Sequence, residues 1–246
     1  MAEEPPQSEA AVNSREDPAG VLCPLDTARP RRYTNPTLSA TQPTPTLHRG
    51  DLPDDFEPGA SVAVDTETMG LVNSRDRLCL VQLSRGDGSA DLVQIAPGQR
   101  EAPNLVRLLR DSRVEKLFHF ARFDMAILQK TFGIMPGPVY CTKIASKLAR
   151  TYTDRHGLKD LVRELLGQEI SKQQQSSDWG APGLSEAQLA YAASDVLYLH
   201  AVREKLDAML RREGRLQLAT ECFAFLPTRV RLDLMGWGDT DIFAHS

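Results

Sequence analysis

The sequence has no long hydrophobic run, no paired-cysteine motif and no glycine-rich phosphate loop, and each absence excludes a class of protein. No apolar stretch approaches the roughly 18 residues that a membrane-spanning helix needs. The motifs GxxxxGK[ST], GxSxG and HExxH are missing, so NTPase, serine-hydrolase and zinc-protease functions have no support. The acidic, proline-rich start lacks an apolar segment, and we expect no secretory signal. The cysteines have neither CxxC pairing nor zinc spacing, and we expect reduced residues in a cytoplasmic protein, at least three of them in apolar surroundings: Cys23, Cys79, Cys141 and Cys222.

Excess positive charge is also lacking. The formal net charge of −4 at pH 7 argues against a broad basic surface for long nucleic acids. A locally basic cleft for a small anionic substrate stays compatible with it. With 246 residues, 41% of them hydrophobic and 25% charged, the composition is that of a globular protein with one large or two small domains.

The first 47 residues differ from the rest of the chain. They hold eight of the sixteen prolines and show almost no apolar periodicity, so they cannot bury enough surface to offset the entropy of ordering. We predict a disordered Pro-rich tail over residues 1–47, or an over-extended start of the chain. A single folded domain is expected over residues 48–246, without internal repeats.

The folded part begins with strands and continues with alternating strands and helices. Apolar runs at 62–64, 78–83 and 92–95 predict an antiparallel meander, with a hairpin turn at Asp87-Gly88. A late helix should begin at Ser185, where Gln188 completes a capping box. This order predicts an α/β fold with a mixed sheet and flanking helices. The remaining predicted elements are helices at 102–111, 121–133, 156–167 and 184–214, a strand at 114–120 and a strand leading into a helix at 138–149.

The stretch VAVDTETMG (residues 62–70) ends a buried strand with two acids. Asp65 and Glu67 are two apart and therefore share one face of the strand. Their charges repel and raise each other's pKa unless a cation lies between them, and carboxylate oxygens suit Mg²⁺ and Mn²⁺. The alternative is a strand that ends in solvent-exposed acids before a glycine turn.

Two further acids have both a functional and a structural interpretation. Asp195 lies four residues after Tyr191, so both occupy one helical face in an apolar stretch, where an unpaired carboxylate is costly. It could instead pair with an arginine or cap a loop. Asp124 falls in the first turn of a helix that follows a strand, a position where the helix dipole alone favours aspartate.

Taken together, these acids predict a site for two cations. A strand, a strand-to-helix junction and a late helix can meet at one end of a sheet. Two metal ions about 4 Å apart are the usual device for in-line attack on a phosphodiester. Tyr191, whose ordinary pKa near 10 makes it a poor base, would hold the attacking water. We predict Asp65, Glu67, Asp124 and Asp195 as ligands of two Mg²⁺ or Mn²⁺ ions, and all four with Tyr191 as catalytic residues.

The motifs DTE, HFARFD and YAASD, in this order, resemble the three exonuclease motifs of the DEDD superfamily, in the subclass with tyrosine in the third motif. Within it the chain is similar to the RNase D group, and more closely to its compact nano-RNase C type, through RDRLCLVQLS, CTKIASKLARTYTDRHGLK, SKQQQSSDW and DIFAHS. The likeness runs from about residue 47 to the C-terminus. It implies a ribonuclease-H-like fold, degradation of nucleic acid from the 3′ end, and Asp65 as the ligand that bridges both ions. Many superfamily members have asparagine where this chain has Phe120, a departure that concerns the 3′-terminal sugar more than the metal site.

The resemblance also implies a substrate and an assembly. The substrate would be short RNA, dinucleotides above all, cut to nucleoside 5′-monophosphates, and the assembly a homo-oligomer, an octameric ring. From the residues alone, the leucine after the Gly70 turn could wedge between bases or pack on the core, and the loop cations could meet a 5′ phosphate or stay solvated. The tryptophan could stack on a base or lie at a subunit contact. The candidate substrate-binding residues are Leu71, His119, Arg155, His156, Lys159, Lys172, Ser176 and Trp179.

Two other functions stay open. A broader RNase D-like exonuclease would act on tRNA precursors or DNA. Full-length RNase D has extra helical domains, whereas only 51 residues follow Asp195 here. A catalytically silent exonuclease fold used for binding would not need all four acids and Tyr191.

Residues 225–246 contain apolar side chains without a clear helical period, and we expect this segment to dock on the domain or on a neighbouring subunit.

Overall fold

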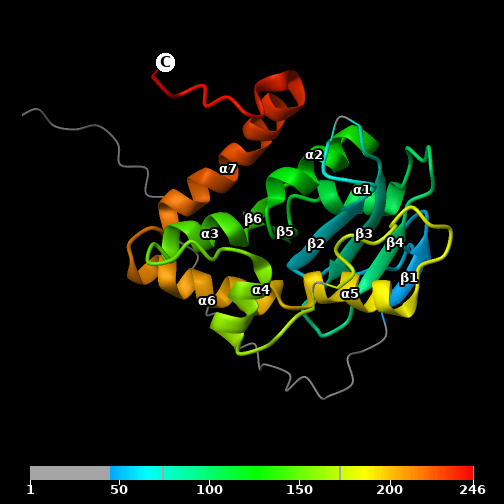
Figure 1. Cartoon of the computed structure of the whole chain (residues 1–246), viewed down its shortest axis with the longest axis horizontal. Helices are drawn as coiled ribbons and strands as arrows, with labels where there is room; N and C mark the ends of the chain where they lie inside the picture. The colour runs from blue at the N-terminus through cyan, green and yellow to red at the C-terminus, as the bar shows by residue number, and fades with distance from the viewer. Residues whose placement is uncertain (1–44, 74, 172, 246) are drawn as a thin grey trace, which may run out of the picture. The chain divides into compact units, whose positions relative to one another are not determined.

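A mixed sheet forms the centre of the domain in the computed structural model, which describes residues 45–245 except Ser74 and Lys172 (Figure 1). The strand order is β1-β4-β3-β2-β5-β6. The β2–β3 and β3–β4 pairs are antiparallel, which confirms the predicted meander, and the β1–β4, β2–β5 and β5–β6 pairs are parallel. The strands are β1 (Thr46–Arg49), β2 (Ser61–Thr68), β3 (Leu78–Ser84), β4 (Asp91–Gln94), β5 (Glu115–Phe118) and β6 (Val139–Cys141).

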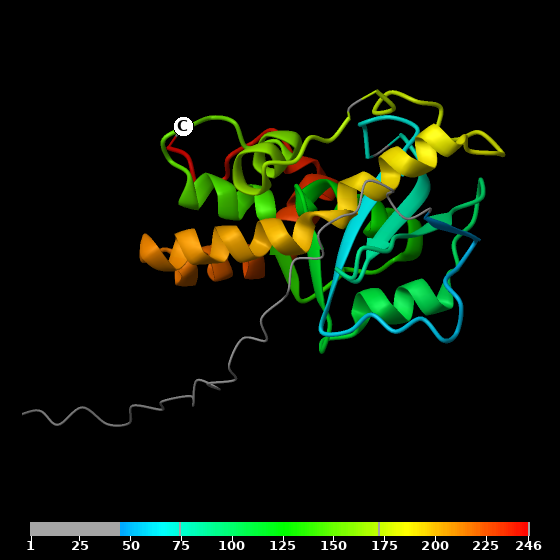
Figure 2. The ribbon, with the colours of Figure 1, turned by 90° about the horizontal axis from the view of Figure 1, so that it is seen from below.

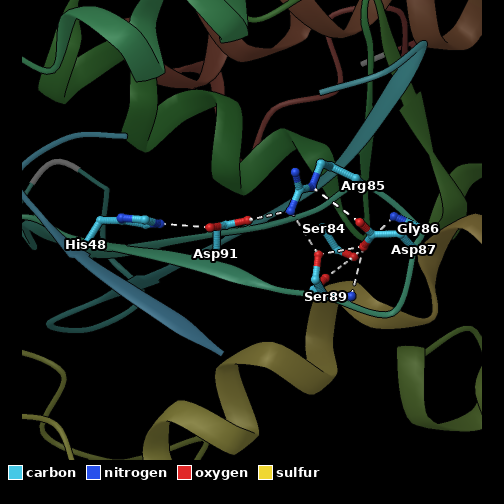
Figure 3. Close-up of polar contacts among 7 residues, drawn as sticks. All are labelled: His48, Ser84, Arg85, Gly86, Asp87, Ser89 and Asp91. Atoms are coloured by element: carbon cyan, nitrogen blue, oxygen red, sulfur yellow. Dashed lines mark hydrogen bonds and ion pairs between the residues drawn. The ribbon is translucent and has the colours of Figure 1, made fainter. Parts of the chain in front are cut away.

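The edge strand β1 is held to β4 by polar side chains next to the β3–β4 turn (Figure 3). The His48 ring donates from Nε2 to Asp91 Oδ1 over 2.8 Å. Arg85 lies between two carboxylates, 3.8 Å from Asp91 and 3.5 Å from Asp87. The network fixes the turn and the edge strand together, so β1 needs no long apolar run of its own.

The predicted start of the folded domain falls inside β1. The strand begins at Thr46, two residues before the expected boundary at residue 48, so Thr46 and Leu47 belong to the sheet. A four-residue strand with three polar side chains gives no apolar pattern by which it could be recognised. Most of the predicted tail, residues 1–44, lies outside the described residues.

Helices cover both faces of the sheet. Helix α5 crosses one face and α1 lies on the other (Figures 1 and 2), and all seven residues of β3 between them are buried. None of the helices in the described part of the chain has the length and apolarity to cross a membrane. The helices are α1 (Pro103–Arg110), α2 (Ala121–Phe132), α3 (Thr142–Ala149), α4 (Leu158–Leu161), α5 (Glu186–Leu197), α6 (Leu199–Arg212) and α7 (Leu216–Leu232), with π-helical turns η1 (Val162–Leu166) and η2 (Asp233–Trp237).

The predicted helix ends are confirmed, but the predicted long helix is divided. The Ser185 side chain accepts a hydrogen bond from the Gln188 N–H, and the Gln188 side chain caps the Ser185 N–H in return. Gly133 and Gly167 adopt left-handed conformations, each with φ of 67°, and end their helices. The segment 184–214 breaks at Tyr198 into α5 and α6. Because α5 packs on β2 and β3 whereas α6 packs on α3, one straight helix could not serve both surfaces.

The C-terminal segment is more regular than predicted. Helix α7 includes Pro227 and buries Ala219, Phe223, Leu226 and Val230, which have helical spacing. The prediction of no helical period was wrong because the period begins before residue 225. Helix α7 packs on α2, α3 and β6, so the part of this segment that ends at Leu232 docks on its own domain, whereas most of the described residues after it are exposed.

Candidate active site

Three acids meet where β2 emerges from the core beneath α5. Asp65 and Glu67 follow the fully buried residues 62–64 of β2, and Asp195 projects from α5, which packs on β2. One carboxylate oxygen of each acid lies within 4.8 Å of the other two. All three side chains are partly buried, so this strand does not end in fully solvated acids.

The fourth acid, Asp124, comes from the first turn of α2 and is 3% exposed. Thr66 donates from Oγ1 to Asp124 Oδ1 over 2.6 Å. Because successive strand residues point to opposite faces, Thr66 points away from its two acidic neighbours and ties Asp124 to β2. Asp124 is therefore oriented by a side chain and is more than a helix-dipole residue.

Burial and mutual repulsion dominate the electrostatics of these acids. Burial raises the pKa of Asp65 from 3.8 to about 7, against a backbone hydrogen bond from Thr66. Burial, and then the charges of Asp65, Asp195 and Asp124, raises the pKa of Glu67 to about 10. The pKa of Asp124 is raised well above its ordinary value for the same reasons. Such a group of oxygen ligands favours positive charge in its midst, and a divalent cation fits it in chemistry and charge.

Tyr191 lies one helical turn before Asp195 and faces the same cavity. Burial, followed by the charge of Asp195, raises the pKa of Tyr191 well above its ordinary value, and a hydrogen bond to Asp195 adds to the effect. Tyr191 therefore stays protonated and acts as a hydrogen-bonding group. Its ring packs against Trp179, with the ring centroids 6.0 Å apart.

The acids face a cavity of about 360 Å³, lined by all five predicted catalytic residues together with Leu71, His119 and Lys159. Leu71 is 86% exposed and so does not pack on the core. The His119 ring hydrogen-bonds the Thr142 hydroxyl from Nδ1 over 2.9 Å. Burial lowers the pKa of His119 to about 3, so the ring is neutral near pH 7.

Four other predicted substrate-binding residues that the structure describes do not line this cavity: Arg155, His156, Ser176 and Trp179. The His156 ring contacts the Ser146 hydroxyl from Nδ1 over 2.9 Å, and Arg155 accepts a hydrogen bond at its backbone carbonyl from Arg150. Ser176 is exposed on a loop. Trp179 is 3% exposed, so its ring is closed to a base, and Lys172 lies outside the described residues.

Sequence reasoning missed Lys143 and treated Phe120 only as a departure from a motif. Both line the cavity, and the Lys143 ammonium lies 4.4 Å from the centre of the Phe120 ring. Phe120 has φ of 70°, a conformation that bulky side chains rarely adopt. The sequence feature that could have identified Lys143 as a cavity residue is its position in the first turn of α3, directly after strand β6. Thr66 could have been found because it stands between the two acids of β2.

Comparison with known proteins agrees with this geometry. Residues 52–211 match the model of the 3′-5′ exonuclease family. The structure is similar to that of Brucella melitensis NrnC (nano-RNase C) bound to pGG, with 61% identity and a TM-score of 0.80 over 82% of this chain and 99% of that one. The same protein with bound Mg²⁺ has 60% identity and a TM-score of 0.79 over 82% of this chain and 100% of that one.

RNase D proteins are more distant and longer. The RNase D of Gluconacetobacter diazotrophicus is 41% identical over 165 residues, which cover 67% of this chain and 42% of that protein. The chain thus matches about two fifths of the length of this curated relative. The ribonuclease-H-like mixed sheet is common to this chain and its NrnC structural neighbours. The chain belongs to the 3′-5′ exonuclease family, as a DEDD-type exonuclease similar to NrnC and RNase D.

Proposed function

We propose that this protein hydrolyses short oligoribonucleotides from the 3′ end, dinucleotides preferentially, to nucleoside 5′-monophosphates. The convergence of the Asp65, Glu67 and Asp195 oxygens within 4.8 Å carries the proposal. Asp124 and Tyr191 complete the site. Two divalent cations, Mg²⁺ or Mn²⁺, would be held by the four acids, and Asp65 would bridge them.

Each residue of the active site has a separate task in this reaction. The cations would lower the pKa of the attacking water and stabilise the charge on the scissile phosphate. Tyr191, kept protonated by its neighbours, would donate its hydroxyl hydrogen bond to orient that water. Asp124 is fixed by Thr66 and would hold its share of the ligand set without rotating. Asp195 ties the tyrosine to the acidic cluster.

The cavity supports a short substrate. Its volume of about 360 Å³ lies at the lower end of the roughly 300–1,000 Å³ that encloses a small-molecule ligand. Leu71 stands exposed at its edge, where a leucine could separate two bases. Lys143 and Lys159 line the wall and would meet phosphate. NrnC, at 61% identity, has been seen with pGG, which favours the same substrate class here.

A homo-oligomer in the cytoplasm, an octameric ring by family resemblance, is part of the proposal. Large apolar side chains are exposed along the C-terminal part of the chain, and a second copy would cover them. They are Leu218, Phe225, Leu234, Met235, Trp237, Ile242 and Phe243.

Timed digestion of 5′-labelled RNAs of two to twenty nucleotides tests the activity and separates it from a broader RNase D-like exonuclease acting on tRNA precursors or DNA. Dinucleotides should disappear fastest, and EDTA should stop the reaction. The Asp65→Asn variant serves as the control, because activity that survives it comes from another site or another protein. Equal rates for dimers and twenty-mers would refute the dinucleotide preference.

A further inference from the structure

Gln82 is a polar residue in the middle of the sheet without a partner. It lies in β3, its side chain is 0% exposed, and within the described residues neither Nε2 nor Oε1 has a hydrogen-bond partner. Burying an amide without partners costs about 1–3 kcal/mol by protein mutational data. A leucine at this position would avoid that cost, so the retained amide calls for a function.

The strand register places Gln82 beside the acidic cluster. Gln82 is the direct cross-strand partner of Asp65, and Leu80 is the partner of Glu67. Directly opposed residues of an antiparallel pair lie on one face with their Cβ atoms about 5 Å apart. The amide of Gln82 is therefore within reach of the Asp65 carboxylate.

The other surroundings of Gln82 are apolar. Its cross-strand neighbour on β4 is Leu92, and Leu80 and Leu92 are fully buried in a cluster with Ala192 of α5. Within the described part of the chain, Asp65 accepts a hydrogen bond from the backbone of Thr66 and from no side chain. An unpaired donor thus stands next to a carboxylate that lacks a side-chain donor.

We infer that Gln82 is a positioning residue for Asp65, on the basis of the proposed function in which Asp65 binds the cations. When the site is loaded, the Gln82 Nε2–H donates to Asp65 and fixes the orientation of its carboxylate. The hydrogen bond relieves the cost of the buried amide only in the loaded state, so it adds to metal affinity. Partners of this kind, one layer behind the ligands, typically change metal affinity by about 10- to 100-fold.

Gln82→Met separates this role from simple packing. Methionine has a similar length and no unsatisfied polar group, so the metal-free variant should melt at the same temperature as the wild type or higher. Its affinity for Mn²⁺, measured by calorimetric titration of metal-free protein, should fall by about 10- to 100-fold. Leu80→Met is the matched control, because Leu80 occupies the same face of β3 opposite Glu67, and its Mn²⁺ affinity should stay within about threefold of the wild type.

Two outcomes would overturn the inference: unchanged Mn²⁺ affinity in Gln82→Met, or an equal loss in Leu80→Met. Gln82→Leu repeats the test if the methionine variant does not fold. In an Asp65→Asn background, Gln82→Met should cause no further loss of affinity, and an additive loss counts against the contact. If Asp65→Asn itself binds Mn²⁺ as the wild type does, Asp65 is not a metal ligand, and the proposed metal site and the role of Gln82 fail together. A loss of Mn²⁺ affinity in Asp65→Asn with unchanged affinity in Gln82→Met overturns the role of Gln82 alone.

Discussion

Replacing Glu67 by glutamine is expected to stabilise the metal-free protein, and to do so more strongly as the pH rises. In the folded protein, burial and the neighbouring acids raise the pKa of Glu67 from 4.5 to about 10. The unfolded chain has ionised this group by pH 6.5, whereas the folded chain still holds the proton. The folded state therefore binds more protons, and its stability falls as the pH rises through this interval.

The size of the effect follows from the pKa. One pH unit corresponds to about 1.4 kcal/mol for one proton, so the wild type should lose about 3 kcal/mol of unfolding free energy between pH 6.5 and 8.5 through Glu67 alone. Because the carboxylate is partly exposed to water, about 2 kcal/mol is a realistic value. Burial lowers the pKa of His119 to about 3 and of His200 to about 4, so neither ring contributes above pH 7.5. Burial of Lys116 lowers its pKa to about 8. Because the wild type and Glu67→Gln both contain this group, its contribution cancels in the difference between their unfolding free energies.

Urea unfolding of the two proteins in EDTA at pH 6.5, 7.5 and 8.5 measures the difference in unfolding free energy directly. Tryptophan fluorescence, to which the buried Trp179 contributes, is the probe. Mn²⁺ at about 100 times its dissociation constant should restore about 2.7 kcal/mol to the wild type and much less to Glu67→Gln. A stability difference that stays constant over this range would refute the reasoning, since Glu67 would then be ionised in the metal-free fold.

Three further predictions concern single contacts. Thr66→Val removes the hydrogen bond to Asp124 and should lower kcat by at least tenfold, with a loss of about 1–2 kcal/mol in unfolding free energy; a normal kcat in a folded variant would show that Asp124 needs no such support. Asp91→Ala leaves His48 without its carboxylate partner and should lower the urea-unfolding free energy by about 2 kcal/mol, whereas an unchanged value would make the contact at β1 dispensable. Phe120→Asn removes the backbone strain of a bulky side chain in a left-handed conformation and should raise the melting temperature by the equivalent of about 1 kcal/mol. KM for dinucleotides should rise because the aromatic wall of the cavity is lost, and a lower melting temperature would show that the Phe120 backbone is not strained.

The main strands and the position of the acids could be predicted because local rules and tertiary environment agree there. The run from residue 62 to 64 is apolar and buried, and the period of two then places Asp65 and Glu67 on one face. The capping box at Ser185 depends only on residues three apart. Each of these features is encoded within a few residues of chain.

Other features depend on contacts that no local pattern records. The break at Tyr198 reflects two different packing surfaces for α5 and α6. Strand β1 is fixed by a hydrogen bond from His48 to Asp91, 43 residues away. The sequence around Trp179 was equally compatible with a ring that stacks on a base and with a ring at a subunit contact. The structure instead buries the ring within its own domain, in a cluster with Leu80 and Ala192.

Gln82 shows where the information for function lies in this fold. In the segment LCLVQL it is one polar residue in an apolar strand, and the sequence alone gives no reason to connect it with DTE, fifteen residues earlier. Once the register sets it opposite Asp65, the same residue becomes the nearest cross-strand donor to a predicted metal ligand. Sequences that fold well have few buried polar groups without partners, and the exceptions concentrate at functional sites. The strand register therefore adds Gln82 to the acidic site as a residue that supports the predicted metal ligand Asp65. If this interpretation is right, Gln82→Met loses Mn²⁺ affinity without losing stability.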